Sequence, residues 1–393
     1  MDLLRDPRAI ALLLAASITI MSNATISPSL PGIEALYSDT PNAGLLTRLL
    51  VTAPALLIAI AAPFAGMAAD RFGRKRQLLA GVILFAIAGS AGLWLDNLYA
   101  LLASRLILGL AVGAVMTAQA AMLGDIYSGP DRGRFMGLQM SAVNFGGFIF
   151  IGLAGWLAGI GALLPFALYA VAALYLPLLW KALPDTHGGA PADHGPASAD
   201  GEANWFAVLC FVIFLSGLAF ILFYVMPTQM PYYLAANGHT DPKMAGLVMA
   251  CVVLAAGIAS LFFGPIRMRL GRGGTPALGF AIMAVGFFVL QAVHALPVYC
   301  AGALLVGTGV GLVMPNFVAI ALDVAPPNHR GAVSGAITTA IFLGQFISPL
   351  VSQPLIDAFG YDIMFEATAV VLLIIVPAVF FGLRPPRREL ARA

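Results

Sequence analysis

Residues 66–76 read GMAADRFGRKR, and residues 264–274 read GPIRMRLGRGG. The two stretches share Gly, Arg, Gly and Arg at the same places, 198 residues apart in a chain of 393. The same offset aligns further pairs over 66–146 and 264–344 without a gap: Gly109 with Gly307, Gly113 with Gly311, Asp125 with Asp323, Gly137 with Gly335 and Gly146 with Gly344. The chain is therefore a duplicated half. In a membrane protein this is typical of a transporter whose site lies between the halves.

The composition indicates a membrane protein. Hydrophobic residues make up 61% of the chain and charged residues 10%, against about 45–50% and about 25% in a soluble domain. Apolar stretches near or above 18 residues can cross a bilayer, and they must be helical because lipid cannot satisfy their backbone polar groups. We predict an all-α integral membrane protein with twelve transmembrane helices, near 9–32, 44–68, 77–95, 98–124, 134–158, 162–183, 205–232, 244–266, 275–293, 296–322, 332–356 and 364–383.

Lys and Arg residues concentrate on one side of the predicted spans. All but three of the 20 lie in the termini or in the loops of that side, and the exceptions are Arg48, Arg105 and Lys243. By the positive-inside rule, both termini and these loops are cytoplasmic. The net charge of +2 therefore reflects topology and does not point to nucleic acid. We expect a monomer in the lipid bilayer of the cell inner membrane.

Two six-helix bundles are expected, at 1–183 and 205–393, with a short basic tail at the end of the second. The cytoplasmic linker at 184–204 is rich in Gly, Pro, Ala, Asp and Ser, as flexible connectors are. The first 30 residues have some likeness to a signal peptide, but they are needed as the first of six spans. Neither the linker histidines nor the three cysteines have metal-ligand spacing, so we expect no metal and no cofactor.

The stretch at 66–76 also has a physical interpretation. Its glycines permit a tight turn and close helix approach, and Asp70 can meet the positive end of a neighbouring helix. The arginines can pair with acids of the other half. A loop that only marked topology would explain the arginines but not the order of the glycines and the acid.

Arg105 is the one charge well inside a predicted span, about 10 Å from its outer end at 1.5 Å per residue. Such a charge indicates a functional group facing a cavity or a partner, although it could also be a structural tie to span one. Glu34, just past span one, is the best candidate for its partner, with Asp96 behind it. Asp125 and Asp323 are better placed to bind the loop arginines.

With these motifs the chain resembles the major facilitator superfamily over its whole length, closest to the drug–proton antiporters with twelve spans. The resemblance implies a cytoplasmic latch between the halves, formed by Gly66, Asp70, Arg71, Gly73 and Arg74. It also implies that Arg105 takes part in proton coupling, for which we expect Glu34 as its partner and Asp70 as second choice. The repeat has Met268 and Ala303 in place of Asp70 and Arg105, so both roles belong to the first half.

One family motif is incomplete. Drug–proton antiporters have a span-five motif of spaced glycines around a Gly-Pro pair. Gly137 and Gly146 fit it, but Phe150-Ile151 stands where Gly-Pro is expected, and Ala154-Gly155 replaces the final glycine pair. The loss of the kink-forming proline weakens the antiport assignment.

The same resemblance places the substrate near the midplane between the halves. The expected polar contacts are Asn23, Ser27, Gln119, Gln139, Asn144, Tyr224, Gln229, Asn316, Thr338 and Gln345, with Phe148, Phe220 and Phe342 as apolar walls. Each polar residue could equally form an interhelical hydrogen bond.

We predict a secondary active transporter that moves a small drug-like or amphipathic compound by alternating access, as proton-coupled multidrug efflux. The alternatives are uptake or facilitated transport of a small organic anion or metabolite, and a non-transporting sensor on the same fold. An enzyme is not expected, because no His or acid lies at membrane depth.

Overall fold

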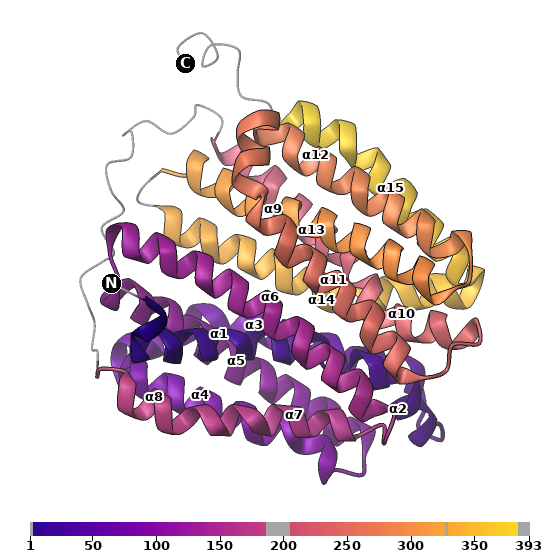
Figure 1. Cartoon of the computed structure of the whole chain (residues 1–393), viewed down its shortest axis with the longest axis horizontal. Helices are drawn as coiled ribbons and strands as arrows, with labels where there is room; N and C mark the ends of the chain where they lie inside the picture. The colour runs from indigo at the N-terminus through magenta and orange to yellow at the C-terminus, as the bar shows by residue number, and fades with distance from the viewer. Residues whose placement is uncertain (1–2, 186–204, 327–328, 384–393) are drawn as a thin grey trace. The chain divides into compact units, whose positions relative to one another are not determined.

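The computed structural model describes residues 3–185, 205–326 and 329–383. Within these ranges the regular structure is helical and no strand occurs. Among the described residues, twelve segments are long and apolar enough to cross a membrane, and each lies over one of the predicted spans. The predicted all-α fold with twelve spans is therefore confirmed. Figure 1 shows the helices coloured by residue number.

The first six spans are built from both long and short helices. Their bounds are η1 (Leu3–Arg5), α1 (Pro7–Ala24), η2 (Ser27–Ser29), α2 (Leu30–Leu36), α3 (Ala43–Phe72), α4 (Arg74–Gly89), η3 (Ser90–Leu93), α5 (Leu98–Ile126), α6 (Gly129–Ala158), η4 (Leu164–Phe166), α7 (Ala167–Ala170), η5 (Val171–Tyr175) and α8 (Leu176–Ala182).

The last six spans consist mostly of long helices. Their bounds are α9 (Trp205–Phe223), α10 (Val225–Ala236), α11 (Pro242–Leu261), α12 (Phe263–Ala292), α13 (Leu296–Val324), α14 (Arg330–Phe359) and α15 (Tyr361–Gly382). The eighth span was expected to continue to residue 266, but α11 ends at Leu261. The residues after it begin α12, which includes the second copy of the loop motif.

Spans one and seven are each interrupted next to a proline. Span one changes from α1 to η2 just before Pro28, and span seven changes from α9 to α10 just before Pro227. A proline has no N–H group, so the carbonyl four residues earlier loses its helical donor. Pro231 inside α10 frees the carbonyl of Pro227 in this way.

The described residues form two compact units. Unit 1 comprises those within 1–195, 224–250 and 345–350, and unit 2 comprises those within 196–223, 251–344 and 351–393. The interruption of span seven coincides with this division, since α9 belongs to unit 2 and α10 to unit 1. The linker at 184–204 lies almost entirely outside the described residues, and the predicted bundle boundaries stay predictions.

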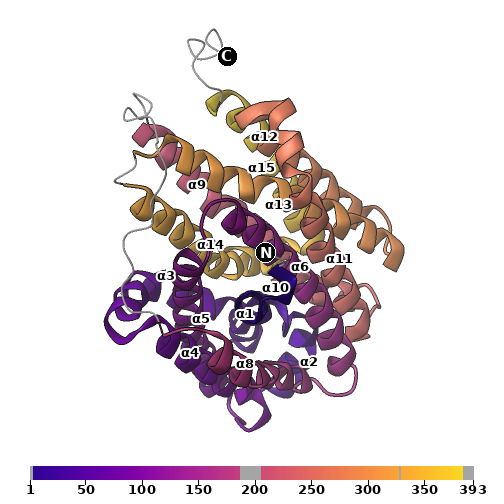
Figure 2. The same ribbon diagram turned by 60° about the vertical axis from the view of Figure 1, so that its left-hand side comes forward.

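Each unit is built around one central set of helices. In unit 1, α1 packs against α3, α5, α6 and α8, and α5 packs against α3 and α4. Figure 2 shows α1 nearly end-on among α5, α6 and α8. In unit 2, α12 packs against α13 and α15, and α9 packs against the same two helices.

Glycines at equivalent places make equivalent helix contacts. A Cβ atom on Gly109 in α5 would overlap the carbonyl oxygen of Pro54 in α3. A Cβ atom on Gly307 in α13 would overlap the carbonyl oxygen of Val252 in α11. Both members of the first pair are 198 residues before those of the second. The duplication therefore extends to atomic contacts, and the expected packing role of these glycines is confirmed.

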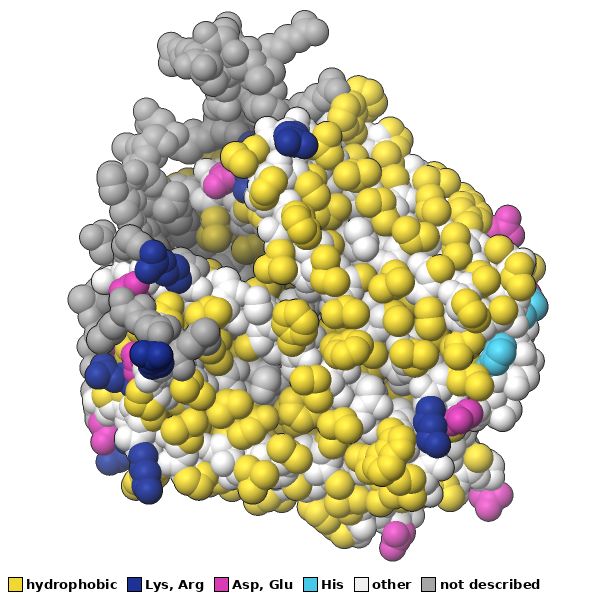
Figure 3. Space-filling view, viewed as in Figure 1, with side chains coloured by type: hydrophobic (Ala, Val, Ile, Leu, Met, Phe, Trp, Pro, Cys, Tyr) yellow, Lys and Arg dark blue, Asp and Glu magenta, His cyan; other side chains and the backbone are white. Residues whose placement is uncertain are grey.

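Large hydrophobic side chains are exposed along the spans. On the face shown in Figure 3, hydrophobic side chains predominate and charged ones are few. Exposed examples within predicted spans are Ile60, Phe214 and Ile374. Such apolar surface is costly in water and is what helices that face lipid present.

Candidate functional site

The loop motif of the first half begins inside α3, turns at Gly73 and ends in the first turn of α4. Gly73, between α3 and α4, has a φ of 92°, in the region where glycine is favoured. Gly271, at the same place in the repeat, has a φ of 74° and interrupts α12. The tight turn predicted for 66–76 is confirmed at Gly73, and the repeat turns at the equivalent glycine. At Gly66, by contrast, no described atom lies within 4 Å of an added Cβ, so no close helix approach accounts for that glycine.

Arg74 anchors the loop to α5. Its Nη1 donates to the Asp125 carboxylate and, at 3.3 Å, to the carbonyl oxygen of Ala121. Arg74 is only 8% exposed, so the pair is better shielded from water than a surface ion pair. The expected pairing of Asp125 with a loop arginine is confirmed.

The repeat builds the corresponding contact differently. Asp323 pairs with Arg267 at 2.5 Å, which confirms its expected pairing, but the two side chains are 58% and 25% exposed. Arg272, the counterpart of Arg74, instead donates from Nε to the carbonyl oxygen of Leu383 at 3.1 Å. The charged contact of the second repeat is therefore more open to water.

The structure describes only one of the two remaining latch side chains. Arg71 is exposed, with its guanidinium 5.5 Å from the centre of the neighbouring Phe72 ring. The side chain of Asp70 lies outside the described residues, so its contact with a helix end stays a prediction.

Arg105 is fully buried in unit 1, on α5. Its Nη2 donates to the carbonyl oxygen of Gly89 and, at 3.2 Å, to that of Ala88, both near the end of α4. The guanidinium lies over the rings of Phe166 and Tyr169, with its Cζ 4.7 and 4.8 Å from their centres. A buried cation is stabilised by such carbonyl and aromatic contacts, although they do not neutralise its charge.

The expected pairing of Arg105 with Glu34 is wrong. Glu34 forms an ion pair with Arg48 at 3.0 Å. The reason is geometric: the Arg105 guanidinium points to the end of α4 and to the aromatic pair, whereas Glu34 in α2 faces the first turns of α3. The role of either residue in proton coupling stays a prediction.

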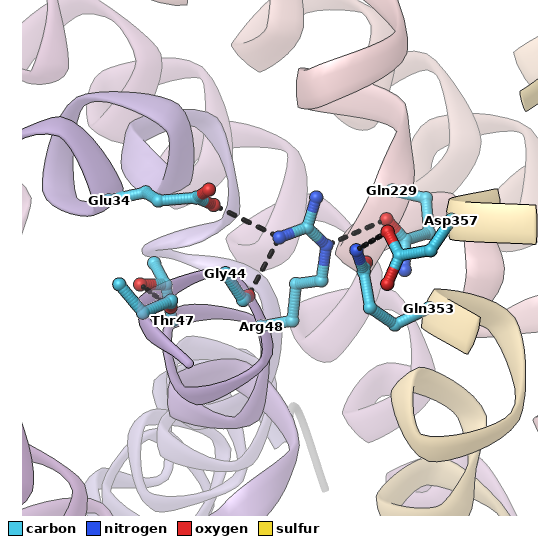
Figure 4. A network of polar contacts seen from close by, with 8 residues as sticks. Glu34, Gly44, Thr47, Arg48, Gln229, Gln353 and Asp357 are labelled. Atoms are coloured by element: carbon cyan, nitrogen blue, oxygen red, sulfur yellow. Dashed lines mark hydrogen bonds and ion pairs between the residues drawn. The ribbon is translucent and has the colours of Figure 1, made fainter. Parts of the chain in front are cut away.

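Arg48 is the centre of a polar cluster that the sequence did not indicate. It is 3% exposed. Its Nη1 donates to Glu34 at 3.0 Å and to the carbonyl of Gly44 at 2.7 Å, and its Nε donates to Oε1 of Gln229 at 2.8 Å. Its Cζ lies 3.6 Å from the centre of the Tyr232 ring. Figure 4 shows the guanidinium between Glu34 and Gln229.

Sequence reasoning treated Arg48 only as a basic residue on the minority side of the membrane. The available signal was its place five residues into an otherwise apolar stretch, where a charge needs a partner. That partner set could not be read from the sequence, since Gln229 and Tyr232 are more than 180 residues away. A cavity of about 540 Å³ borders the cluster at Glu34, Gly44 and Tyr232.

Several expected substrate contacts are used between helices. The donors and their carbonyl acceptors are Ser27 with Pro227, Gln119 with Leu12 at 3.1 Å, and Asn316 with Arg272 at 2.9 Å. All three donor residues are buried. The structural alternative left open for these residues is therefore realised in the observed conformation.

The other expected contacts vary in burial and bonding. Asn144 and Thr338 donate to carbonyls of their own helices, at 2.8 and 2.9 Å. Gln139 is half-buried, and Tyr224 and Gln345 are buried. The side chain of Asn23 lies outside the described residues. Among the described side chains, no three His, Cys, Asp or Glu residues lie close enough together to hold a metal ion.

Comparison with known proteins decides the family. The family model described as Major Facilitator Superfamily matches residues 12–233 and 209–393, which together span nearly the whole chain. The chain belongs to the Major Facilitator Superfamily. The resemblance inferred from the loop motif and the duplication is confirmed.

Members of the superfamily that resemble this chain include two resistance proteins. Multidrug resistance protein 2 of Bacillus subtilis (strain 168) is 26% identical over 320 residues, which cover 78% of this chain and 79% of the relative. Tetracycline resistance protein, class G, of Vibrio anguillarum is 27% identical over 376 residues, covering 92% and 91%.

A solved structure shows the same fold. A partially occluded inward open conformation of the xylose transporter XylE from E. coli matches with a TM-score of 0.75 at 16% identity, covering 96% of this chain and 97% of that one. As a superfamily member, the protein is a multi-pass membrane transporter of small molecules and not an enzyme.

Proposed function

We propose that the protein exports a small drug-like or amphipathic organic compound in exchange for protons, by alternating access. The observation that carries the proposal is the match to relatives named for multidrug and tetracycline resistance, over 78% and 92% of this chain. Export of a toxic compound is a direct way to confer resistance. The low charge content of the spans suits neutral or amphipathic cargo better than sugars or phosphates.

Substrate contact is assigned to the ten polar residues named from the sequence. Two of the ten offer a physical reason for contact with a substrate. The side-chain carbonyl oxygens of Asn316 and Gln345 are buried and accept no hydrogen bond from the described residues. Buried acceptors are normally satisfied, so a donor group on a substrate would be favoured at each.

Proton exchange is assigned to the carboxylates of Glu34 and Asp70, and Arg105 is assigned a fixed positive charge. The Glu34 side chain is 34% exposed, so water can reach it to deliver a proton. Arg105 contacts carbonyls and rings and no described carboxylate, so its charge acts at a distance on protonation inside unit 1.

The arrangement in the membrane is also proposed. The loop with Arg74 faces the cytoplasm with both termini, and residues 66–74 latch two six-helix halves together on that side. The protein is a monomer in the cell inner membrane, surrounded by lipid. The asymmetric distribution of Lys and Arg supports this orientation.

Flux in proteoliposomes tests the export proposal. Vesicles containing the purified protein are given an acidic lumen and an external panel of fluorescent drug-like compounds. Antiport predicts uphill accumulation in the acidic lumen, because protons leave as the compound enters, and an ionophore should abolish it. Accumulation only with an alkaline lumen would instead support proton-coupled uptake.

Variants separate the coupling residues from the rest of the transporter. Glu34→Gln and Asp70→Asn should each reduce gradient-driven flux but retain substrate counterflow, which needs no proton gradient. If neither variant affects gradient-driven flux, the assigned coupling is wrong. If the wild-type protein shows neither counterflow nor gradient-driven flux, the sensor alternative replaces transport.

A further inference from the structure

Helix α10 of the second repeat packs with the first repeat in unit 1. It contacts η2, α2 and α3. The Ser27 hydroxyl donates to the carbonyl of Pro227, which has no helical donor because Pro231 lacks an N–H group. The interruption in span one therefore bonds to the interruption in span seven.

Arg48 joins the same elements through charged and polar contacts. Glu34 and the Gly44 carbonyl bind it from the first repeat, and Gln229 and Tyr232 bind it from α10. Arg48 is 3% exposed, and a buried guanidinium needs such partners to offset the loss of water. Its burial therefore depends on the presence of α10.

The Arg48 guanidinium can be stabilised in two different environments. With α10 in place it is buried and bonded, and with α10 withdrawn it would be bonded to Glu34 and hydrated. An apolar side chain in place of Arg48 would have no comparable environment once α10 had withdrawn, because its exposure to water would be unfavourable. Two discrete arrangements of one contact set are what a conformational switch requires.

We propose that Arg48 is the gate residue at the end of unit 1 where α10 packs against α2 and α3. Its contacts with Gln229 and Tyr232 hold α10 against α2 and α3, and they must break and re-form in each transport cycle. Glu34 positions the guanidinium for this contact. The inference rests on transport by alternating access, but not on the direction of transport or on the coupling ion.

A second contact reinforces the gate. A Cβ atom on Gly155 of α6 would lie 2.7 Å from Cα of Gly246 in α11, so these two backbones touch. Gly155 is the one glycine that survives from the final pair of the span-five motif. Gly246 is also the counterpart of Arg48 at the offset of 198. One repeat thus uses a charge at this position, and the other uses close backbone contact.

A buried cysteine behind the gate provides the test. Thr52 is fully buried one turn after Arg48 on the same face of α3. In a chain whose three native cysteines are replaced by alanine, Thr52→Cys is exposed to a membrane-impermeant maleimide without substrate or gradient. Arg48→Met should accelerate labelling about tenfold, as the open state becomes more populated. Arg269→Met, which removes an exposed positive charge in α12, away from these contacts, should leave the rate unchanged.

Two further variants keep the proposal testable if Arg48→Met does not fold. Gln229→Leu should also accelerate labelling, and Gly155→Ala should do so because its methyl group displaces α11. Where the double variant Arg48→Met/Gln229→Leu can be made, it should label no faster than the faster single variant, since both remove one contact. Unchanged labelling in Gln229→Leu and Gly155→Ala would overturn the gate. Accelerated labelling without gradient-driven flux would retain the gate and refute proton-driven export.

Discussion

The two repeats carry different side chains at two equivalent positions in their interiors. In the first, Gly89 on α4 lies against Tyr169, whose side chain a Cβ atom at Gly89 would overlap, and its carbonyl accepts a hydrogen bond from the fully buried Arg105 of α5. In the second, the equivalent positions carry Phe287 and Ala303, also fully buried, and the Phe287 ring packs 5.9 Å from that of Phe365. Packing alone does not require a charge at this position.

A similar difference recurs at other polar positions. The first repeat has Arg48 and the shielded Arg74–Asp125 pair, whereas the second has Gly246 and an Arg267–Asp323 pair that is more exposed. The glycine contacts of α5 and α13 are nevertheless the same. The scaffold is thus duplicated, while the contacts that we assign to the transport cycle are concentrated in the first repeat.

The largest expected effect tests the part of the comparison in which the repeats agree. Gly109→Ala and Gly307→Ala each place a methyl group against a backbone carbonyl of the neighbouring helix, which should cost about 3 kcal/mol of stability. Thermal unfolding of the purified variants measures this. A large loss in one variant and none in the other would break the structural equivalence of the repeats.

Arg105 tests the part in which the repeats differ. Arg105→Met keeps much of the side-chain volume and makes the site more like its apolar counterpart, so the unfolding free energy should change by less than about 1.5 kcal/mol. Gradient-driven flux should fall at least about tenfold, a barrier increase of about 1.4 kcal/mol. Full flux in a stable Arg105→Met protein would show that the arginine is only a packing residue.

The smallest effect concerns Tyr127, whose counterpart is Ala325. Its hydroxyl donates to Asp6 at 2.8 Å, and Tyr127→Phe should cost about 1 kcal/mol of stability. Burial, with the hydrogen bond to Asp6, raises the pKa of Tyr127 well above its usual value. Because the pKa is raised in the folded protein, the contribution of Tyr127 to stability is fully present below its unfolded-state pKa of about 10. It is lost only at higher pH. Unfolding curves of the two proteins should therefore differ by the same amount from pH 7 to pH 9.

Sequence reasoning succeeded where the determinants are local or periodic. Apolar length predicted the spans, and the loop glycines predicted the turn at Gly73. The positions of Asp125 and Asp323 at span ends predicted that each pairs with a loop arginine. It failed for the partner of Glu34. The sequence did not show that the fold places Arg48, and not Arg105, next to Glu34. The aromatic partners of Arg105 were also missed, since Phe166 and Tyr169 are some 60 residues further along and apolar in pattern.

The most direct test of the asymmetry uses one substitution at the same position of both repeats. Asp125→Asn and Asp323→Asn remove equivalent carboxylates, one from a shielded ion pair and one from an exposed pair. Gradient-driven flux in proteoliposomes, normalised to the amount of folded protein, should fall at least about fivefold for Asp125→Asn and less than about twofold for Asp323→Asn. Equal losses, or a greater loss for Asp323→Asn, would contradict the assignment of transport control to the first repeat.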